Sequence, residues 1–585
     1  MGKIFSLVTS HKSLITILLI ASFLRLWKLN EVPVSLFGDE LDVGYHAYSI
    51  LKTGKDYYGN PWPIHFHSIA EWRTPLYLYS AVPTVAIFGI SPLGVRLPAA
   101  IFGILSVFGI YLVVKELLGY NNVLTTRHPH AILSTLLIAI SPWHIQYSRA
   151  GFEVTELLAF LLLGLYFFFR ALRNKGNLLW VSIALLTFTP WIYSTAKLFT
   201  PLLLIFIFQV WRKDIVKMPR TDLVKGVLAG LIIGLPIAFS TFFGGGTQRA
   251  QYTSVFTDPS TIEPEVGTAR LRDAAMRGDL ALGYVATFSD RFFHNKVTFW
   301  MNAITKNYLE SISTDFLFEN GDPNLRHSIK GMGQFYKIEV IPLILGLILY
   351  FASKIDRKIK FLLIFWITFG VLPAALTRDG GNHATRLILI LPPLIFLISY
   401  GIFETTTRLS KNLKIIFLIV YCLLLAVNFV FYQHTYWIHN PWDSERWWHA
   451  GLKESIQSIK DIENGYDQVI ISMKGEPSWI FFAAWYQYPP DKWQTNFPIG
   501  NDVNVSGFGK ISHIDKFYFG TFNVEGKSLY DLPKYIDSKT LYMAVAKEMG
   551  PNLILEPERT PPGLKLVKAI PYPSGEPAYY LLTTN

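Results

Sequence analysis

A succession of long apolar stretches is the feature that most constrains how this chain can fold. A helix that crosses a bilayer needs about 20 mostly apolar residues. Of the residues, 51% are hydrophobic and only 16% are charged, against about 25% charged in soluble domains. The sequence therefore predicts a polytopic α-helical membrane protein with about 11 transmembrane helices. The predicted spans lie at roughly residues 14–29, 96–118, 130–146, 154–172, 177–193, 196–211, 223–243, 338–353, 360–376, 386–403 and 413–432.

The positions of the basic residues predict how these helices are oriented. A net charge of +11 would suit a nucleic-acid partner, but the cations fall in short loops between apolar runs rather than in a stripe on a soluble face. Every second loop is rich in Lys and Arg, as cytoplasmic loops are. We therefore expect an integral protein of the cell (plasma) membrane with its N-terminus inside and no nucleic-acid partner. The cations of the predicted inner loops are Lys115, Arg127, Arg170, Arg173, Lys175, Arg212, Lys213, Lys217, Arg220, Lys354, Arg357, Lys358, Lys360, Arg408, Lys411 and Lys414.

Three polar segments remain on the predicted outer side. Residues 1–432 form the membrane domain, whose outer loops are 30–95 and 244–337, and residues 433–585 form an extracytoplasmic domain. Counting the apolar segment 75–90 as a span would move the basic loops outside, so we expect it to lie in the membrane interface. The last segment changes character, because VIISM, KFYFGTF, LYMAVA and YYLLTT read as short strands between Pro and Gly clusters. A small α/β domain is predicted there.

The first outer loop opens with a group of acidic residues. In SLFGDELDVGYHAYSILKTGKDYYG, Asp39, Glu40 and Asp42 follow the first apolar stretch, and a helix would place Asp39, Asp42 and His46 on one face. A carboxylate at the outer boundary can stay ionised and accept a proton from a substrate hydroxyl. Capping of the helix N-terminus by Asp39 is the structural alternative.

More ionisable residues stand at the same predicted depth. Each cation among them could simply extend its head group to the interface, but together they place charges from at least four segments at one boundary, where such charges usually serve function. Cations there can bind a lipid phosphate and stabilise the charge that it gains on leaving. The residues concerned are Glu71, Arg73, Arg149, Glu153, Lys197, His383 and Arg386.

Several stretches are similar to those of a known family. Over residues 14–432 the chain resembles the GT-C membrane glycosyltransferases, in particular the prokaryotic relatives of protein O-mannosyltransferase and of the lipid A aminoarabinose transferase. The similar stretches are FGDELDVGYHAYSILKTGKDYYG, EWRTPLYLYSAVP, VRLPAAIFG, YSRAGFE, YSTAKLFTPL and NHATRLILILPP.

This resemblance implies an inverting transfer of a sugar from a polyprenyl-phosphate-linked donor, without a required metal. It implies that Asp39 is the catalytic base, with Glu40 beside it. It further implies donor or acceptor contacts at Glu71, Arg73, Arg149, Glu153, Lys197, His383 and Arg386, and in the loop GDPNLRHS at Arg326 and His327. Arg73-Thr74-Pro75 stands where the eukaryotic protein mannosyltransferases have His-Pro-Pro, so the acceptor remains a lipid, a glycan or a protein.

Two other functions and one cofactor stay open from the sequence. A flippase would bind its substrate near the bilayer midplane in repeated halves, and a ligase or polymerase would use a pyrophosphate-linked donor. A metal site could use His65 and His67 with Asp39, Asp42 or His46, although a His-x-His pair in a loop is more often incidental. In RWWHAG, His449 stands where oligosaccharyltransferases have Asp in a Trp-Trp-Asp signature, and a chance match is favoured.

Overall fold

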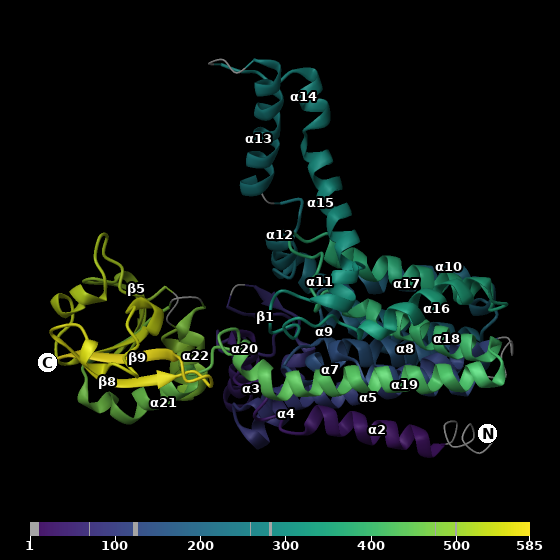
Figure 1. The fold of residues 1–585 in the computed structure, drawn as a ribbon, viewed down its shortest axis with the longest axis horizontal. Coiled ribbons are helices and arrows are strands. Elements are labelled where there is room, and N and C mark those ends of the chain that lie inside the picture. Colours follow the sequence, from purple (N-terminus) through teal and green to yellow (C-terminus); the bar gives the residue numbers. More distant parts are fainter. Residues whose placement is uncertain are drawn as a thin grey trace.

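The computed structural model describes residues 11–585, apart from residues 70, 121–126, 258, 280–282, 474–475 and 498–499. Long helices form a bundle, a sheet domain lies beyond one end of it, and a helical arm projects from its side (Figure 1). Each of the predicted spans contains a helix, which confirms the fold class. These helices are α2 (His11–Leu26), α5 (Pro92–Gly119), α6 (Arg127–Ile140), α8 (Val154–Arg173), α9 (Leu179–Ile192), α10 (Ala196–Ile215), α11 (Arg220–Phe243), α16 (Val340–Ala352), α17 (Arg357–Ala375), α18 (Leu391–Arg408) and α19 (Lys411–His434).

Six helical segments among the described residues are long and apolar enough to cross a membrane. They are Pro92–Gly119, Val154–Arg173, Arg220–Phe243, Arg357–Ala375, Ile388–Arg408 and Lys411–Asp443. The predicted span at 130–146 is wrong in its continuity, because the chain breaks at Ser141 and starts a second helix, α7 (Pro142–Arg149). Proline is well suited to that first helical position because its missing N–H would have no partner there.

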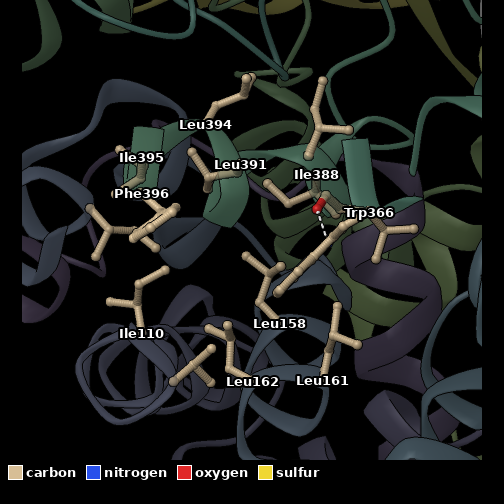
Figure 2. Close-up of a cluster of buried hydrophobic side chains, with 14 of the residues drawn as sticks. Ile110, Leu158, Leu161, Leu162, Trp366, Ile388, Leu391, Leu394, Ile395 and Phe396 are labelled. Carbon is tan, nitrogen blue, oxygen red and sulfur yellow. Dashed lines mark hydrogen bonds between the residues drawn. The ribbon is translucent and has the colours of Figure 1, made fainter. Parts of the chain in front are cut away.

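The helices of the bundle pack through a large apolar core. Leu158, Leu161 and Leu162 of α8 face Ile110 of α5, and the short 3-10 turn at Ile388–Ile390 leads into α18 above them (Figure 2). The indole Nε1 of Trp366 donates a hydrogen bond of 2.8 Å to the carbonyl of Leu389. This bond satisfies a polar group that would otherwise be costly in an apolar interior.

Two glycines bring α16 and α18 into close contact. A Cβ atom on Gly401 would collide with the carbonyl oxygen of Pro342, and a Cβ atom on Gly346 would collide with that of Leu397. Small residues at such crossings let helix backbones approach each other directly in membrane proteins. The sequence contains both glycines, but only the structure shows that they face the partner helix.

The first outer loop is built from two helices and a short hairpin. Helix α3 (Gly38–Thr53) is followed by strands β1 (Phe66–His67) and β2 (Trp72–Arg73) and by α4 (Leu76–Phe88). With 13 residues, α4 is about 20 Å long, which is shorter than the ~30 Å hydrocarbon core. Because α16, which lies in a predicted span, is equally short at 13 residues, the interfacial position of segment 75–90 stays a prediction.

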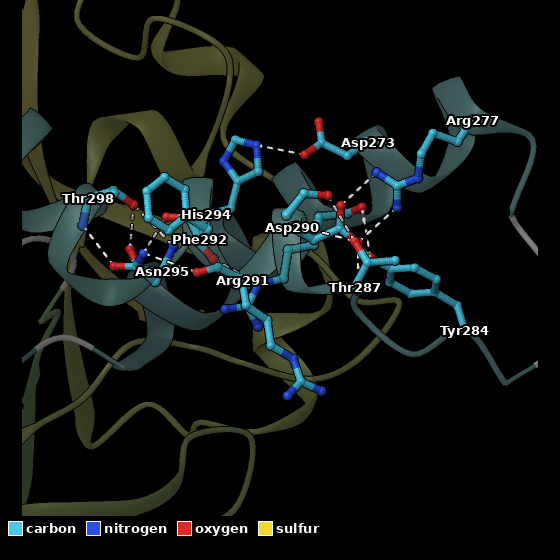
Figure 3. Close-up of polar contacts among 12 residues, drawn as sticks. Asp273, Arg277, Tyr284, Thr287, Asp290, Arg291, Phe292, His294, Asn295 and Thr298 are labelled. Carbon is cyan, nitrogen blue, oxygen red and sulfur yellow. Dashed lines mark hydrogen bonds and ion pairs between the residues drawn. The ribbon is translucent and has the colours of Figure 1, made fainter.

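In the second outer loop, α13 (Pro259–Arg277), α14 (Phe288–Phe293) and α15 (Lys296–Ser311) form the projecting arm, and α12 (Gln248–Thr253) lies at its base beside the bundle (Figure 1). The turn between α13 and α14 is fixed by Asp290, which forms two ion-pair contacts of 2.7 and 2.8 Å with Arg277 and accepts a hydrogen bond of 2.6 Å from Tyr284 (Figure 3). Asp290 also forms a capping box with Thr287. The arm is therefore held by polar contacts rather than by a large core.

The C-terminal domain contains one seven-stranded mixed sheet with the order β4-β5-β6-β3-β7-β9-β8. Strand β3 pairs in parallel with β6 and β7, and the other neighbours are antiparallel. All four predicted strands are present, as β3, β6, β7 and β9. The strands are β3 (Gln468–Ile471), β4 (Asp502–Val505), β5 (Gly509–Ile514), β6 (Phe517–Phe519), β7 (Thr540–Val545), β8 (Leu564–Pro571) and β9 (Pro577–Thr584).

The central strands β3, β7 and β9 of this sheet are buried on both faces. Val469 and Ile471 pack in one apolar cluster and Ile470 in another, as the alternation of a strand requires. Helices α21 (Leu452–Ile462) and α22 (Ser478–Tyr486) contribute to the first cluster. In the aromatic stretch PSWIFFAAWYQYPP, Trp479 and Phe482 are buried in this core.

The sheet domain is joined to the first outer loop by a shared core. One cluster contains Leu41 and Tyr57 of that loop together with Trp479 and Trp493 of the domain. In addition, the hydroxyl of Tyr45 donates a hydrogen bond of 2.9 Å to the carbonyl of Tyr488. Helix α3 therefore has a fixed position between the bundle and the C-terminal domain.

We expect Gly401→Ala to lower the free energy of unfolding by about 1–3 kcal/mol, because the added methyl group overpacks the α16–α18 crossing. Thermal denaturation in detergent, followed by fluorescence, measures the change. Gly267→Ala is the matched control, since its helix α13 leaves no atom within 4 Å of the new Cβ; it should be neutral or slightly stabilising. Equal melting temperatures for Gly401→Ala and the unmodified protein would contradict this view of the crossing.

Candidate active site

Helix α3 begins at the end of the bundle that faces the sheet domain and has Asp39 in its first turn. Phe37 is the N-cap residue and no side chain caps the helix, so capping by Asp39 is not its role. Solvent reaches the Asp39 side chain, whereas Glu40 and Asp42 are completely buried. Acidic side chains are favourable in the first turn of a helix because they interact with the positive end of the helix dipole.

Arg73 connects three of the predicted site segments. From the end of β2 its Nη1 donates a hydrogen bond of 3.0 Å to the backbone carbonyl of Asp39 and lies 3.3 Å from Asp42 Oδ2. Its Nη2 pairs with Glu153 Oε1 at 2.9 Å. Burial lowers the pKa of Arg73, but Glu153, Asp39 and Asp42 outweigh it and hold that pKa above its usual value. The structure thus brings Asp39, Arg73 and Glu153 together.

Asp42 is the buried partner in this network. It accepts hydrogen bonds from the hydroxyls of Tyr57 at 2.6 Å and Ser68 at 2.9 Å. The neighbouring His46 ring stacks on Tyr57, and burial lowers the pKa of His46 to about 3. Because the oxygens of Asp42 are engaged and enclosed, Asp39 is the accessible carboxylate of the pair.

The environment of Asp39 favours its protonated form. Protein surrounds this carboxyl closely enough that burial raises its pKa above the usual value of 3.8. Arg73 and Arg326 oppose the rise, while Glu476 and Asp42 add to it. A carboxyl whose pKa is raised in this way is a stronger base when it is ionised.

Glu40 holds the first turn of α3 in place through buried contacts. It forms a two-pronged ion pair with Arg96, with contacts of 2.7 and 2.9 Å, and accepts a hydrogen bond of 2.7 Å from the backbone N–H of Gly151. Arg96 and Glu40 are both fully buried. The predicted position of Glu40 beside the base is therefore a buried one, which links α3 to α5 and to the segment after α7.

Arg149 also lies inside the protein, not on an accessible face. Its guanidinium donates to the carbonyls of Leu24 at 3.0 Å and Val32 at 2.9 Å, and it lies over the ring of Trp437. Its complete burial and these bonds give Arg149 a role in joining α2 to the first outer loop, and the substrate contact stays a prediction. Sequence position could not distinguish these roles, because both place an Arg at the end of a span.

Lys197 lies in the first turn of α10, and Glu71 lies in the first outer loop. The ammonium of half-buried Lys197 lies 3.0 Å from His65 Nε2, and His65 Nδ1 lies 2.7 Å from the hydroxyl of Ser240. Both ring nitrogens of His65 thus have protein partners in this structure. Glu71 stands in the β1–β2 turn, where its backbone carbonyl accepts a hydrogen bond from Ser68.

The C-terminal domain contributes a carboxylate that the sequence analysis missed. Glu476 Oε1 lies 3.0 Å from Arg326 Nη1 and 3.2 Å from His449 Nε2. Burial raises the pKa of Glu476, but His449 and Arg326 outweigh it and hold the pKa at about 2. A Cβ atom on Gly38 would collide with Glu476 Oε2, so this carboxylate reaches the start of α3, one residue from Asp39.

The remaining predicted residues gather beside Arg326. His327 and His383 have rings 5.0 Å apart, and Arg386 pairs with Asp379 at 2.7 Å. The side chain of Arg326 lies over the ring of Phe37, the cap residue of α3. In RWWHAG, buried Trp448 packs on the same Phe37. The Trp-Trp-His stretch of RWWHAG is the sequence feature that indicates a role for residues 446–451.

The family match supports the resemblance found in the sequence. Residues 73–239 match the family described as dolichyl-phosphate-mannose-protein mannosyltransferase. This match confirms that the chain resembles the protein O-mannosyltransferase type of membrane glycosyltransferase. A comparison with curated proteins found no match.

Two solved structures are also similar. AglB, an oligosaccharyltransferase from Archaeoglobus fulgidus in complex with an inhibitory peptide and a dolichol-phosphate, is 13% identical, with 81% of this chain and 64% of that chain covered and a TM-score of 0.46. ArnT from Cupriavidus metallidurans, bound to undecaprenyl phosphate, is 10% identical, with 97% of both chains covered and a TM-score of 0.47. The chain thus spans somewhat less than two thirds of the archaeal protein.

We expect Arg96→Ala to destabilise the protein by about 3–5 kcal/mol, because it leaves the Glu40 carboxylate buried without its partner. Thermal denaturation followed by gel filtration measures the loss. The double variant Glu40→Leu/Arg96→Met removes both charges and should recover part of it. Lys28→Ala is the control, since its pair with Glu31 is exposed and such pairs contribute about 0–1 kcal/mol. A loss as small as that of Lys28→Ala would contradict the assigned role.

Proposed function

We propose that this protein is a glycosyltransferase that moves a sugar from a polyprenyl-phosphate-linked donor to an acceptor hydroxyl on the extracytoplasmic face of the cell membrane. The observation that carries the proposal is Asp39, an accessible carboxylate whose position is fixed by buried Arg73 and which interacts electrostatically with Arg326. The match of residues 73–239 to a mannosyltransferase family supports the same chemistry.

The transfer is a single displacement with inversion at the sugar. Asp39 accepts the proton of the acceptor hydroxyl, and the hydroxyl oxygen of the acceptor forms a bond to the anomeric carbon of the sugar. The bond between that carbon and the phosphate oxygen breaks on the opposite face, and its electron pair stays on the polyprenyl phosphate. The sugar passes through an oxocarbenium-like transition state, as in glycoside hydrolysis.

Cations at the accessible side bind the leaving phosphate in this proposal. Arg326 is only partly exposed, at 18% of its side chain, and Lys197 is half-buried. Their charges would stabilise the phosphate as it gains negative charge. Arg73 is buried and paired with carboxylates, so we assign it to positioning Asp39.

The arrangement favours transfer over transport. A transporter binds its substrate near the bilayer midplane, on interrupted helices of repeated halves. Here Asp39 and Arg73 come from the first outer loop and Glu476 from the C-terminal domain, not from the middle of a span. A ligase that uses pyrophosphate-linked oligosaccharides is the second candidate, and the choice of donor in the assay distinguishes it.

We expect Asp39→Asn to abolish transfer, because the amide cannot accept the proton, while donor binding is retained. The assay supplies radiolabelled polyprenyl-phosphate hexose in detergent or liposomes and measures label on acceptor. Glu31→Gln, an exposed acid in the same loop, is the control and should keep full activity. Turnover near normal in a folded Asp39→Asn protein would remove Asp39 from the mechanism, and use of a pyrophosphate donor alone would favour the ligase.

The pH dependence of kcat/KM provides an independent test. The base must be ionised to accept a proton. Because the pKa of Asp39 is raised, activity should be lost on acidification at a higher pH than for an ordinary aspartate. Arg326 lowers this pKa and Glu476 raises it. We therefore expect Arg326→Gln to move the acid limb to higher pH and Glu476→Gln to move it to lower pH. Shifts in the same direction, or none, would show that the limb reports another group.

A further inference from the structure

Three side chains of the metal-ligand type meet beside the proposed active site. Asp322 and His327 come from the loop after the π-helix η2 (Asp315–Glu319), and His383 comes from the loop between α17 and α18. One ligand atom from each residue lies within 4.8 Å of the other two. This is the one such group of three among the described residues.

Hydrogen bonds orient two of these side chains. The backbone N–H groups of Asn324 and Ala384 each donate a bond of 2.9 Å to the Asp322 carboxylate. His327 Nδ1 lies 3.0 Å from the hydroxyl oxygens of both Tyr147 and Thr385. When Nδ1–H donates to these hydroxyls, the lone pair of Nε2 is left for a ligand. Metal-binding histidines are generally oriented in this way by a hydrogen bond to the other ring nitrogen.

The distances between the ligand atoms of these residues are close to those in an occupied metal site. His383 Nδ1 and Asp322 Oδ2 are 3.9 Å apart, too far for a hydrogen bond. Ligands bound at 2.0–2.1 Å in tetrahedral geometry lie about 3.4 Å from each other, so a small approach of the two side chains would accommodate an ion. His383 keeps 21% of its side chain exposed, which gives the site an accessible side.

We propose that Asp322, His327 and His383 bind a divalent transition-metal ion of the zinc class. Two imidazoles and one carboxylate favour such ions over magnesium or calcium, which prefer oxygen ligands. Three protein ligands leave at least one coordination position open. The ion would join the loop at 322–328, which carries Arg326, to the loop at 376–387. The metal site does not depend on the proposed sugar transfer.

The sequence alone does not reveal this site. Asp322 and His327 are five residues apart, but His383 follows 56 residues after His327, beyond two helices. The family resemblance implies substrate contacts at both histidines and no required metal. The structure adds the third ligand, Asp322, and brings the three together.

The test is a titration of the purified full-length protein with Zn²⁺ and with Co²⁺ after treatment with a chelator. We expect one ion per chain by calorimetry, visible absorption bands of cobalt with nitrogen ligands, and a rise in melting temperature on addition of zinc. His383→Gln, at the accessible side, should fold and lose the binding at least tenfold. His327→Ala should do the same.

The control variant removes another histidine pair. His434 and His439 lie 3.1 Å apart at exposed positions, so His434→Ala/His439→Ala reports any binding there and should leave the titration unchanged. The proposal is overturned if the unmodified protein binds no stoichiometric ion. It is equally overturned if the folded His383→Gln and His327→Ala variants bind as the unmodified protein does.

Discussion

The geometry of the candidate site depends on one buried guanidinium. Arg73 cannot be left unpaired away from water, because an uncompensated buried charge costs several kcal/mol. It therefore needs Asp42 and Glu153 at the distances observed, and it contacts the backbone of Asp39 in the same arrangement. The requirement to neutralise Arg73 thus fixes the start of α3 relative to the β1–β2 hairpin and to the start of α8.

Around this network the charges divide into two groups. Glu40, Arg96 and Arg149 are fully buried, with contacts to charged partners or backbone carbonyls. Asp39, Arg326 and Lys197 keep some access to solvent. Buried pairs hold the helices in register, and accessible groups remain for chemistry. Residues of the same type and depth in the sequence therefore serve different purposes, and only their partners distinguish them.

The sequence predicted the parts of the fold that depend on local patterns. Apolar runs of sufficient length located the helices of the bundle, and short β-like runs between Pro and Gly clusters located β3, β6, β7 and β9. It also placed Asp39, Arg73 and Glu153 at one boundary. It missed Glu476 and Asp322, because their partners Arg326 and His383 come from distant segments of the chain and leave no periodic signal. The single span expected at 130–146 failed at Ser141-Pro142, where a local breaker outweighed the apolar composition.

The shared core of α3 and the sheet domain has a consequence for biosynthesis. Tyr45 bonds to Tyr488, a partner 443 residues later in the chain, and Glu476 reaches Gly38 from equally far away. At about 5–20 residues per second, a ribosome needs roughly 20–90 s to connect the two. During that interval α3, which bears Asp39, lacks the packing that the sheet domain supplies. The start of α3 therefore reaches its final geometry only after the last domain has folded against it.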